Sequence, residues 1–133
     1  AEWEYACRGG RTDEIPLYRT WNTGDTSGEI ASKEKPPMPL VTVPVGSYEP
    51  NGFGMHDMCG NVYEWVADYR AKGYYGKSPL EDPQGPSSGY LRVIRGWHWV
   101  ATGPGCKVYV ANEPWTGSRF IGFRVVLDRA DTR

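Results

Sequence analysis

The chain has no long apolar run, no cluster of basic residues and no regular cysteine pattern. Its apolar stretches fall well short of the roughly 20 residues that a membrane-spanning helix requires. The 15 Lys and Arg residues are balanced by 16 Asp and Glu residues, and the net charge is -1. Binding to nucleic acid or to an acidic membrane surface would require clustered basic charge. The sequence therefore predicts no membrane insertion and no nucleic-acid partner.

The cysteines Cys7, Cys59 and Cys106 are an odd number at irregular spacing. They form no CxxC pair and no Cys/His ligand pattern, which argues against a zinc site and against a disulfide framework. Unpaired cysteines are often buried as small apolar residues. We interpret the three as free and mostly buried thiols.

Sustained helical periodicity is also scarce, because 17 glycines and 11 prolines interrupt nearly every segment. Residues 1–8 predict one helix, which ends at Gly9-Gly10 in a left-handed cap. Residues 61–71 predict a second helix, because apolar side chains recur at positions i, i+3, i+4 and i+7. These are Val62, Trp65, Val66 and Tyr69.

Short strands are predicted at 41–45, 91–94 and 120–127, and loops at 22–39 and 73–89. A chain of 133 residues is one domain, 1–133, and can bury a core without a metal or a disulfide. We expect an α+β domain with little regular structure and many ordered loops. Ala1 stands in the body of the first helix with no cap before it, so we expect a trimmed start. The cellular location is not predicted.

Aromatic residues are abundant, with 6 Trp and 9 Tyr, and several fall between Arg92 and Val126. The ends of this segment, RVIRG and IGFRVV, are strand-like. Between them, large rings alternate with Gly, Pro, Thr, Asn and Ser, which is poor material for a regular core. Trp and Tyr offer a wide contact area at low entropy cost. The segment therefore predicts a surface that binds a protein or another ligand.

Three motifs resemble the formylglycine-generating enzyme (sulfatase-modifying factor) family. They are AEWEYACRGG, PVGSYEPNGFGMHDMCGNVYEWVADY and RVIRG…IGFRVV, in the family's order, and the resemblance runs from Ala1 to about Val126. It implies a variant of the C-type lectin fold, with two helices, a small antiparallel sheet and long irregular loops.

The enzymes of this family oxidise a sulfatase cysteine to formylglycine with a pair of copper-binding cysteines. Counted from Trp99, the resemblance places the first cysteine at Ala101 and the second at Cys106. Ala101 has no thiolate, so the two-sulfur copper site cannot form, and we predict neither copper nor enzyme activity. The alternative is an oxidase-like enzyme that retains one-cysteine copper chemistry at Cys106. Cys106 could also be a reactive thiol, but a buried small residue is the favoured interpretation.

The chain most resembles the variable proteins of diversity-generating retroelements, whose C-terminal segment is rewritten by mutagenesis. Here that segment would cover about 92–124, and Gly96-Trp97-His98 places two large rings where small residues are typical. The same departures fit a generic non-catalytic paralogue. His98, a lone histidine without a neighbouring acid or nucleophile, is not expected to be catalytic. The predicted ligand-binding residues are Trp97, His98, Val100, Ala101, Thr102, Pro104, Tyr109, Asn112, Trp115, Ser118 and Phe120.

The stretch from Asp57 to Glu64 resembles a calcium site of the family. Calcium takes about six to eight oxygen ligands from carboxylates and carbonyls. The resemblance assigns Asp57, Gly60, Val62 and Glu64 as ligands of a structural calcium ion. The alternative is that Asp57 caps the helix at 61–71 and that Glu64 accepts hydrogen bonds from backbone amides.

Overall fold

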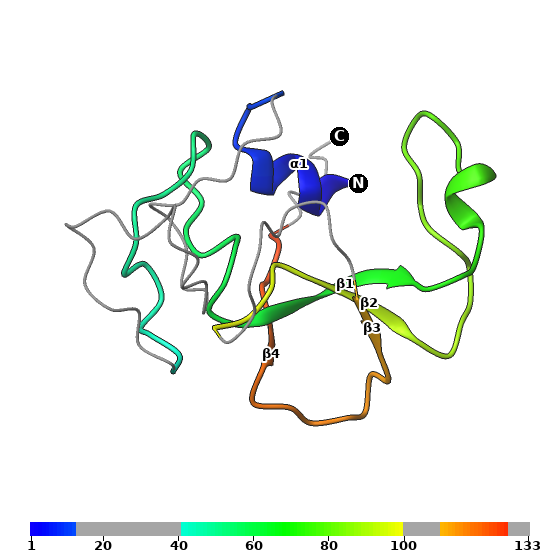
Figure 1. Cartoon of the computed structure of the whole chain (residues 1–133). Coiled ribbons are helices and arrows are strands. Elements are labelled where there is room, and N and C mark those ends of the chain that lie inside the picture. Colours follow the sequence, from blue (N-terminus) through cyan, green and yellow to red (C-terminus); the bar gives the residue numbers. More distant parts are fainter. Residues whose placement is uncertain (13–40, 100–109, 128–133) are drawn as a thin grey trace, which may run out of the picture.

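The computed structural model describes residues 1–12, 41–99 and 110–127. These residues form an α-helix, a short 3-10 helix and a four-stranded sheet joined by long loops. Figure 1 shows α1 over the sheet, with segment 41–60 to one side of it and segment 70–90 to the other. The loop predicted at 22–39 lies outside the described residues.

Helix α1 spans Glu2–Arg8 and confirms the first predicted helix. Arg8 Nη2 lies 2.7 Å from Glu4 Oε1, an ion pair across one turn. Gly9 ends the helix at a φ of 57°, and its N–H donates to the Ala6 carbonyl. Side chains disfavour this left-handed conformation, so a glycine ends the helix here.

The second predicted helix is wrong, because residues 61–71 contain strand β1, Tyr63–Tyr69. Gly60 and Asn61 precede it with φ values of 88° and 61°, and a left-handed pair does not lead into a right-handed helix. The apolar residues of the predicted stripe are β-branched or aromatic and suit a strand equally well. Strands on both sides of β1 satisfy its backbone groups.

The sheet has the order β3-β2-β1-β4, with β2 at Arg92–Arg95, β3 at Val110–Asn112 and β4 at Ile121–Phe123. Strands β1 and β2, and β2 and β3, pair antiparallel. Strand β4 pairs parallel to β1, so the prediction of an antiparallel sheet is wrong at this edge. The long chain between β1 and β4 provides the crossover that a parallel pair needs.

Two of the three predicted strands are present, at least in part, and one is absent from the described residues. Strand β2 confirms the one at 91–94, shifted by one residue, whereas β4 covers only the first part of 120–127. Residues 41–45 form a bend and a turn instead of a strand. There, the side chain of Asn61 donates to the Val43 carbonyl and accepts from the Val43 N–H, both at 3.1 Å. One side-chain amide thus takes the place of a neighbouring strand.

The segment 73–89 is irregular, as predicted, apart from the 3-10 helix η2 at Tyr74–Gly76. A small core packs α1 against the segment before β1: Cys7, Met58 and Cys59 are buried, and Trp3 packs against them. Cys7 Sγ lies 3.4 Å from Cys59 Sγ. Burial of these two cysteines is confirmed. Cys7 is disulfide-bonded, though not to Cys59, whose Sγ is too distant, so the interpretation of three free thiols is wrong. Three irregularly spaced cysteines do not reveal their connectivity.

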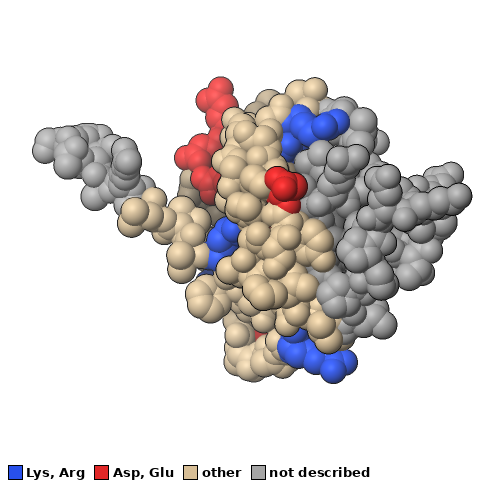
Figure 2. Space-filling view, turned by 90° about the vertical axis from the view of Figure 1, so that its left-hand side faces the viewer, with Lys and Arg blue, Asp and Glu red and all other residues tan. Residues whose placement is uncertain are grey.

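Several large apolar side chains of the described residues are exposed, including Val45, Phe123, Val125, Val126 and Leu127. Figure 2 shows one face of the molecule, on which acidic and basic side chains are scattered over a largely uncharged surface. Among the residues that the structure describes, no helix has the length and apolar character needed to cross a bilayer.

Candidate ligand-binding surface

An ion pair between buried Glu64 and half-buried Arg124, together with Trp3, joins three elements. Arg124, just after β4, donates from Nη2 to Glu64 Oε1 at 2.7 Å and from Nε to both Glu64 oxygens. The Trp3 indole N–H of α1 donates to Glu64 Oε2 at 2.9 Å. Glu64 itself lies in β1 and is 6% exposed. Hydrogen bonds from two sides make this pair a strong link between α1, β1 and β4.

A second ion pair joins α1 to β2. Arg95 Nη2 lies 2.9 Å from Glu4 Oε2, and the Arg95 side chain is 7% exposed. Burial raises the pKa of Glu4, but hydrogen bonds and charge from Arg8 and Arg95 outweigh it and hold this pKa below its ordinary value. We call Glu4, Glu64, Arg95 and Arg124 the buried frame; Glu64 and Arg95 are buried, and Glu4 and Arg124 are half-buried. These residues attach the sheet to the helix.

The turn after β2 carries the first predicted contact residues. Gly96 and Trp97 both have left-handed backbones, with φ values of 96° and 64°. A bulky side chain is disfavoured at such an angle by about 1–2 kcal/mol. The Trp99 N–H donates to the Asn61 carbonyl at 3.0 Å, which fastens the turn to the start of β1. A fastened turn can hold Trp97 in a conformation that its own side chain does not favour.

Around this turn the rings form an aromatic cluster, which comprises Tyr63, Trp97, His98, Trp99 and Phe120. His98 is central: its ring lies 5.0 Å from that of Tyr63 and 4.5 Å from that of Phe120. Trp97 stacks on Tyr63 at 6.3 Å, and Trp99 lies 5.4 Å from Phe120. All five rings are half-buried. They therefore keep part of their area available for contact.

Two features of the aromatic cluster bear on its chemistry. Burial lowers the pKa of His98 below its ordinary 6.5, so the ring is neutral at pH 7. The Nε1 atom of Trp97 is buried and, among the residues that the structure describes, has no hydrogen-bond partner. An unpaired buried donor costs about 1–3 kcal/mol. Strain and an unpaired donor thus coincide at Trp97, a combination that often marks functional positions.

A second exposed group lies at the far end of the segment. Trp115 is 64% exposed and meets Tyr90, 62% exposed, edge to face with ring centroids 5.0 Å apart. The Tyr90 hydroxyl donates to Glu113 Oε1 at 3.0 Å, and this hydrogen bond raises the pKa of Tyr90. A turn bond from Thr116 N–H to the Glu113 carbonyl holds the loop. Two exposed rings are thus held together before any ligand arrives.

The structure separates the predicted contact residues. Trp97, His98 and Phe120 join the aromatic cluster, and Trp115 joins Tyr90. Two others have local structural roles, since Asn112 Oδ1 accepts from the Glu113 N–H and Ser118 Oγ accepts from the Phe120 N–H. Five predictions lie outside the described residues, as does Cys106. These are Val100, Ala101, Thr102, Pro104 and Tyr109.

Sequence reasoning missed Tyr63, Tyr90 and Arg119. Arg119 lies over the rings of Phe120 and Trp99, at 4.8 and 5.6 Å from their centroids. Tyr63 and Tyr90 precede the 92–124 segment, and only strand pairing and loop packing bring them to it. Tyr90 carried a weak signal, because it stands two residues before the strand that leads into the turn.

The predicted calcium ligands lie together, but they are not all available. Asp57, Gly60, Val62 and Glu64 line one cavity of about 330 Å³, which Arg124 also lines. Asp57 Oδ2 accepts from the Gly46 N–H at 2.7 Å, which leaves Oδ1 for an ion. Both oxygens of Glu64 are taken by Arg124 and Trp3. Asp57 does not cap a helix, because a strand follows it.

The donor set fits calcium only in part. Arg124 neutralises the Glu64 carboxylate, so Asp57 supplies the remaining negative charge. Among residues 1–12, 41–99 and 110–127, no three His, Cys, Asp or Glu side chains gather as a metal site. Backbone carbonyls of Gly60 and Val62 would have to provide much of the coordination.

We compared the chain with known protein families and with solved structures. Residues 1–129 match the sulfatase-modifying factor enzyme 1-like domain. The chain belongs to this family. The formylglycine-generating enzyme of Streptomyces coelicolor is 36% identical over 96% of the chain and 45% of its own length. The chain thus spans about half the length of that relative.

Solved structures of similar proteins show the same fold. Variable protein 1 of Treponema denticola matches with a TM-score of 0.69 and 31% identity, over 92% of the chain and 43% of that protein. PvdO of Pseudomonas aeruginosa matches with a TM-score of 0.67 and 30% identity, over 92% and 48%. These neighbours confirm the predicted α+β fold of the formylglycine-generating enzyme type. One of these structural neighbours is a variable protein. One of the sequence relatives is a formylglycine-generating enzyme.

Proposed function

We propose that this sulfatase-modifying factor domain is a ligand-binding domain without oxidase activity, and that its 97–120 segment contacts a protein or other surface ligand. The observation that carries the proposal is the division between the buried frame and the displayed rings. Glu64 and Arg124 are held by several partners, whereas Trp115 and Tyr90 are more than 60% exposed. Exposed Trp and Tyr rings are typical anchors of protein contacts.

The scaffold and the contact residues have separate tasks in this mechanism. The frame keeps α1, β1, β2 and β4 in place, so the turn and the loop start from fixed positions. The aromatic cluster and the Tyr90–Trp115 pair then supply apolar contact area that is already ordered. Pre-ordering reduces the entropy lost on binding. Thr102, Asn112 and Ser118 are the proposed adaptable hydrogen-bonding positions.

The absence of oxidase activity is tested with copper and a cysteine-containing sulfatase peptide. We expect no copper-dependent oxygen consumption above the blank without peptide, and no change on Cys106→Ser. The matched variant Ala101→Cys supplies the sulfur of the first cysteine position and should raise the affinity for Cu(I), because soft metal prefers soft ligands. Turnover by the natural chain that disappears on Cys106→Ser would establish the rival oxidase, which the relation to the Streptomyces enzyme favours.

We further propose that residues 92–124 are diversified by a retroelement. The likeness to variable protein 1 of Treponema denticola supports this, as does the large ring of Trp97 at a left-handed backbone position. The test is genomic: a reverse transcriptase gene and a near-copy of the 92–124 coding segment, differing at adenines, should lie near the gene. Finding neither would leave a generic binding domain.

A structural calcium ion is proposed at Asp57, Gly60, Val62 and Glu64. If it binds, millimolar calcium should raise the thermal midpoint, because a ligand of the folded state stabilises it. Asp57→Asn should remove this effect, whereas the matched variant Asp82→Asn, on the exposed 73–89 loop, should retain it. An unchanged midpoint in calcium would contradict the site.

A further inference from the structure

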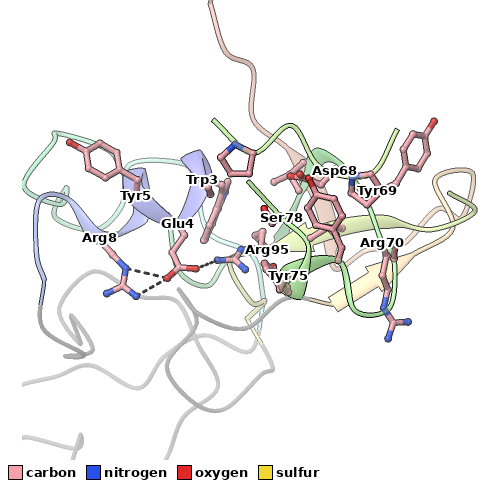
Figure 3. Close-up of a pocket in the computed structure, with 17 residues that line it drawn as sticks. Trp3, Glu4, Tyr5, Arg8, Asp68, Tyr69, Arg70, Tyr75, Ser78 and Arg95 are labelled. Atoms are coloured by element: carbon pink, nitrogen blue, oxygen red, sulfur yellow. Dashed lines mark hydrogen bonds and ion pairs between the residues drawn. The ribbon is translucent and has the colours of Figure 1, made fainter. Parts of the chain in front are cut away.

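A cavity of about 480 Å³ lies between α1 and segment 70–86, with β1 and β2 beneath it. Figure 3 shows its lining, with the Trp3 and Glu4 side chains of α1 on one side and Asp68 and Tyr69 on the other. None of the residues proposed above as ligand contacts or calcium ligands lines it. Its volume falls in the range of about 300–1,000 Å³ that small-molecule sites occupy.

Most charged groups in this cavity satisfy one another. Glu4 lies between two guanidinium groups, 2.7 Å from Arg8 Nη2 and 2.9 Å from Arg95 Nη2, as the dashed lines in Figure 3 mark. One carboxylate shared by two guanidinium groups leaves this network with one net positive charge, and Asp68 is the other carboxylate that lines the cavity. Arg70 is exposed, and its side chain points away from Asp68 in Figure 3.

Asp68 differs from these groups. Its carboxylate is half-buried, and within the described residues it has no hydrogen bond or ion pair. Gly85 packs directly against it: a Cβ at Gly85 would stand 2.4 Å from Asp68 Oδ1. The bare glycine backbone therefore closes one side of the carboxylate without neutralising it. An unpaired carboxylate in a partly apolar cavity favours a cationic partner.

The cavity walls suit the same kind of ligand. Trp3, Tyr69 and Tyr74 line it together with Val66. Two of these rings already attract cations of the protein itself, because Arg92 lies 3.5 Å from the Tyr69 ring centroid and Arg95 lies 5.1 Å from that of Trp3. Ring faces attract cations through their quadrupole. Within the described residues no arginine lies over the ring of Tyr74, so this ring face remains for a ligand; Tyr5 and Tyr75 also line the cavity.

We propose that this cavity binds a small organic cation, an ammonium group carried on an apolar body. The ammonium group pairs with Asp68, and the apolar body packs on Tyr74 and Val66. The cavity is concave and lined from three elements, which favours a small molecule over an extended peptide. This site is independent of the proposed contact surface at 97–120.

The test uses three probes of similar shape and different charge: 2-phenylethylammonium, 2-phenylethanol and 3-phenylpropionate. Each is titrated into the full chain while the amide signal of Gly85 and the indole signal of Trp3 are followed by NMR. We expect the ammonium ion to bind about tenfold more tightly than the alcohol, a difference typical of one charge-assisted contact. Equal affinity for the two, or tightest binding of the carboxylate, would overturn the proposal.

Variants separate the charge from the shape of the cavity. Asp68→Asn should weaken ammonium binding about tenfold and leave the alcohol unchanged. The matched control Glu49→Gln removes an exposed carboxylate outside the cavity and should change neither. Tyr74→Ala should weaken both probes alike. If Asp68→Asn weakens both probes equally, or neither, the carboxylate does not recognise the cation and the proposal fails.

A lysine-containing peptide with blocked termini is the fourth probe, and it tests whether the cavity binds a peptide instead of a small molecule. We expect it to bind more weakly than the small ammonium ion, because its backbone has to remain outside the cavity. Tighter binding of the peptide at Gly85 and Trp3 would overturn the assignment to a small molecule. Contact-surface variants such as Trp115→Ala should not alter any of these titrations, so failure of this site and failure of the proposed function are distinguishable.

Discussion

Three residues of the buried frame, Glu64, Arg95 and Arg124, lie within a few residues of the aromatic cluster in the sequence, but the frame and the cluster are stabilised in opposite ways. Glu64 has Arg124 and Trp3 as partners for both of its oxygens. Trp97, in contrast, has a left-handed backbone and an indole N–H with no partner within the described part of the chain. The frame therefore depends on the identity of its residues, whereas the cluster holds rings that the fold does not require. Such a division allows side chains on the surface to change while the scaffold remains.

The largest expected effects are on the frame and on Trp3, which donates to it. Arg124→Met leaves Glu64, whose side chain is 8% exposed, with the Trp3 indole as its partner. Breaking a buried pair from one side costs about 3–5 kcal/mol. Since the Arg124 side chain is 30% exposed, we expect a loss of about 2–3 kcal/mol in the free energy of unfolding, measured in urea.

The matched control is Arg119→Met, which removes a cation over the half-buried rings of Trp99 and Phe120 and should cost less than about 1 kcal/mol. Equal losses for Arg119→Met and Arg124→Met would mean that the frame and the cluster do not differ in this way.

A smaller effect is expected when two tryptophans of the same turn are compared. Trp97→Gly and Trp99→Gly each remove a half-buried ring, but only the change at Trp97 relieves a left-handed side chain. We expect Trp97→Gly to be more stable than Trp99→Gly by about 1–2 kcal/mol. Urea unfolding of both variants measures the difference. A less stable Trp97→Gly would show that its ring packing outweighs the strain.

Acidification should affect the cluster before the frame. Burial lowers the pKa of His98 below 6.5, so the unfolded chain binds the proton more readily. The contribution of neutral His98 to the free energy of unfolding is complete above about pH 6.5. It is lost as the pH falls from there through the pKa of His98 in the folded chain. The pKa of Glu4 is held below 4.5, so its contribution is present above 4.5 and is lost only at lower pH.

The free energy of unfolding of the natural chain should therefore decrease when it is measured from about pH 7 down to about pH 5. His98→Phe should remove this slope, and the control His56→Gln should retain it. A slope that survives His98→Phe would assign it to another group.

The smallest effect on stability is expected at Trp115, because its ring is 64% exposed. Trp115→Ala should change the free energy of unfolding by less than about 0.5 kcal/mol. Trp3→Ala is the contrasting variant, because Trp3 donates to Glu64 and packs on the core, and should cost about 3 kcal/mol. A similar cost at both positions would show that Trp115 belongs to the scaffold.

Local patterns predicted the elements that local interactions define. Helix α1 follows from its i, i+4 ion pair and its glycine cap, and β2 from its β-branched residues. The segment 61–71 was mispredicted, because a half-buried apolar stripe suits a helix and a strand alike. Left-handed Gly60 and Asn61 and the strands on both sides of β1 decided the outcome.

The candidate site was predicted in part for the same reason. Trp97, His98 and Phe120 stood out because rings among turn residues are unusual. Tyr63 and Tyr90 could not be found in this way, since contact with the segment depends on strand register and loop packing. The cavity at Asp68 also needs residues from α1, β1, β2 and the 70–86 segment.

By itself, the sequence determined membership of the family, the first helix, the β2 strand and the lack of a thiol at Ala101, because these depend on residue type and short spacing. Only the tertiary structure decided that Glu64 pairs with Arg124, that β4 runs parallel to β1, and that Asp68 faces an aromatic cavity. Glu64 and Arg124 are 60 residues apart. Contacts over such separations form when the chain closes long loops to bury its charges and rings, and no local pattern records which partners meet.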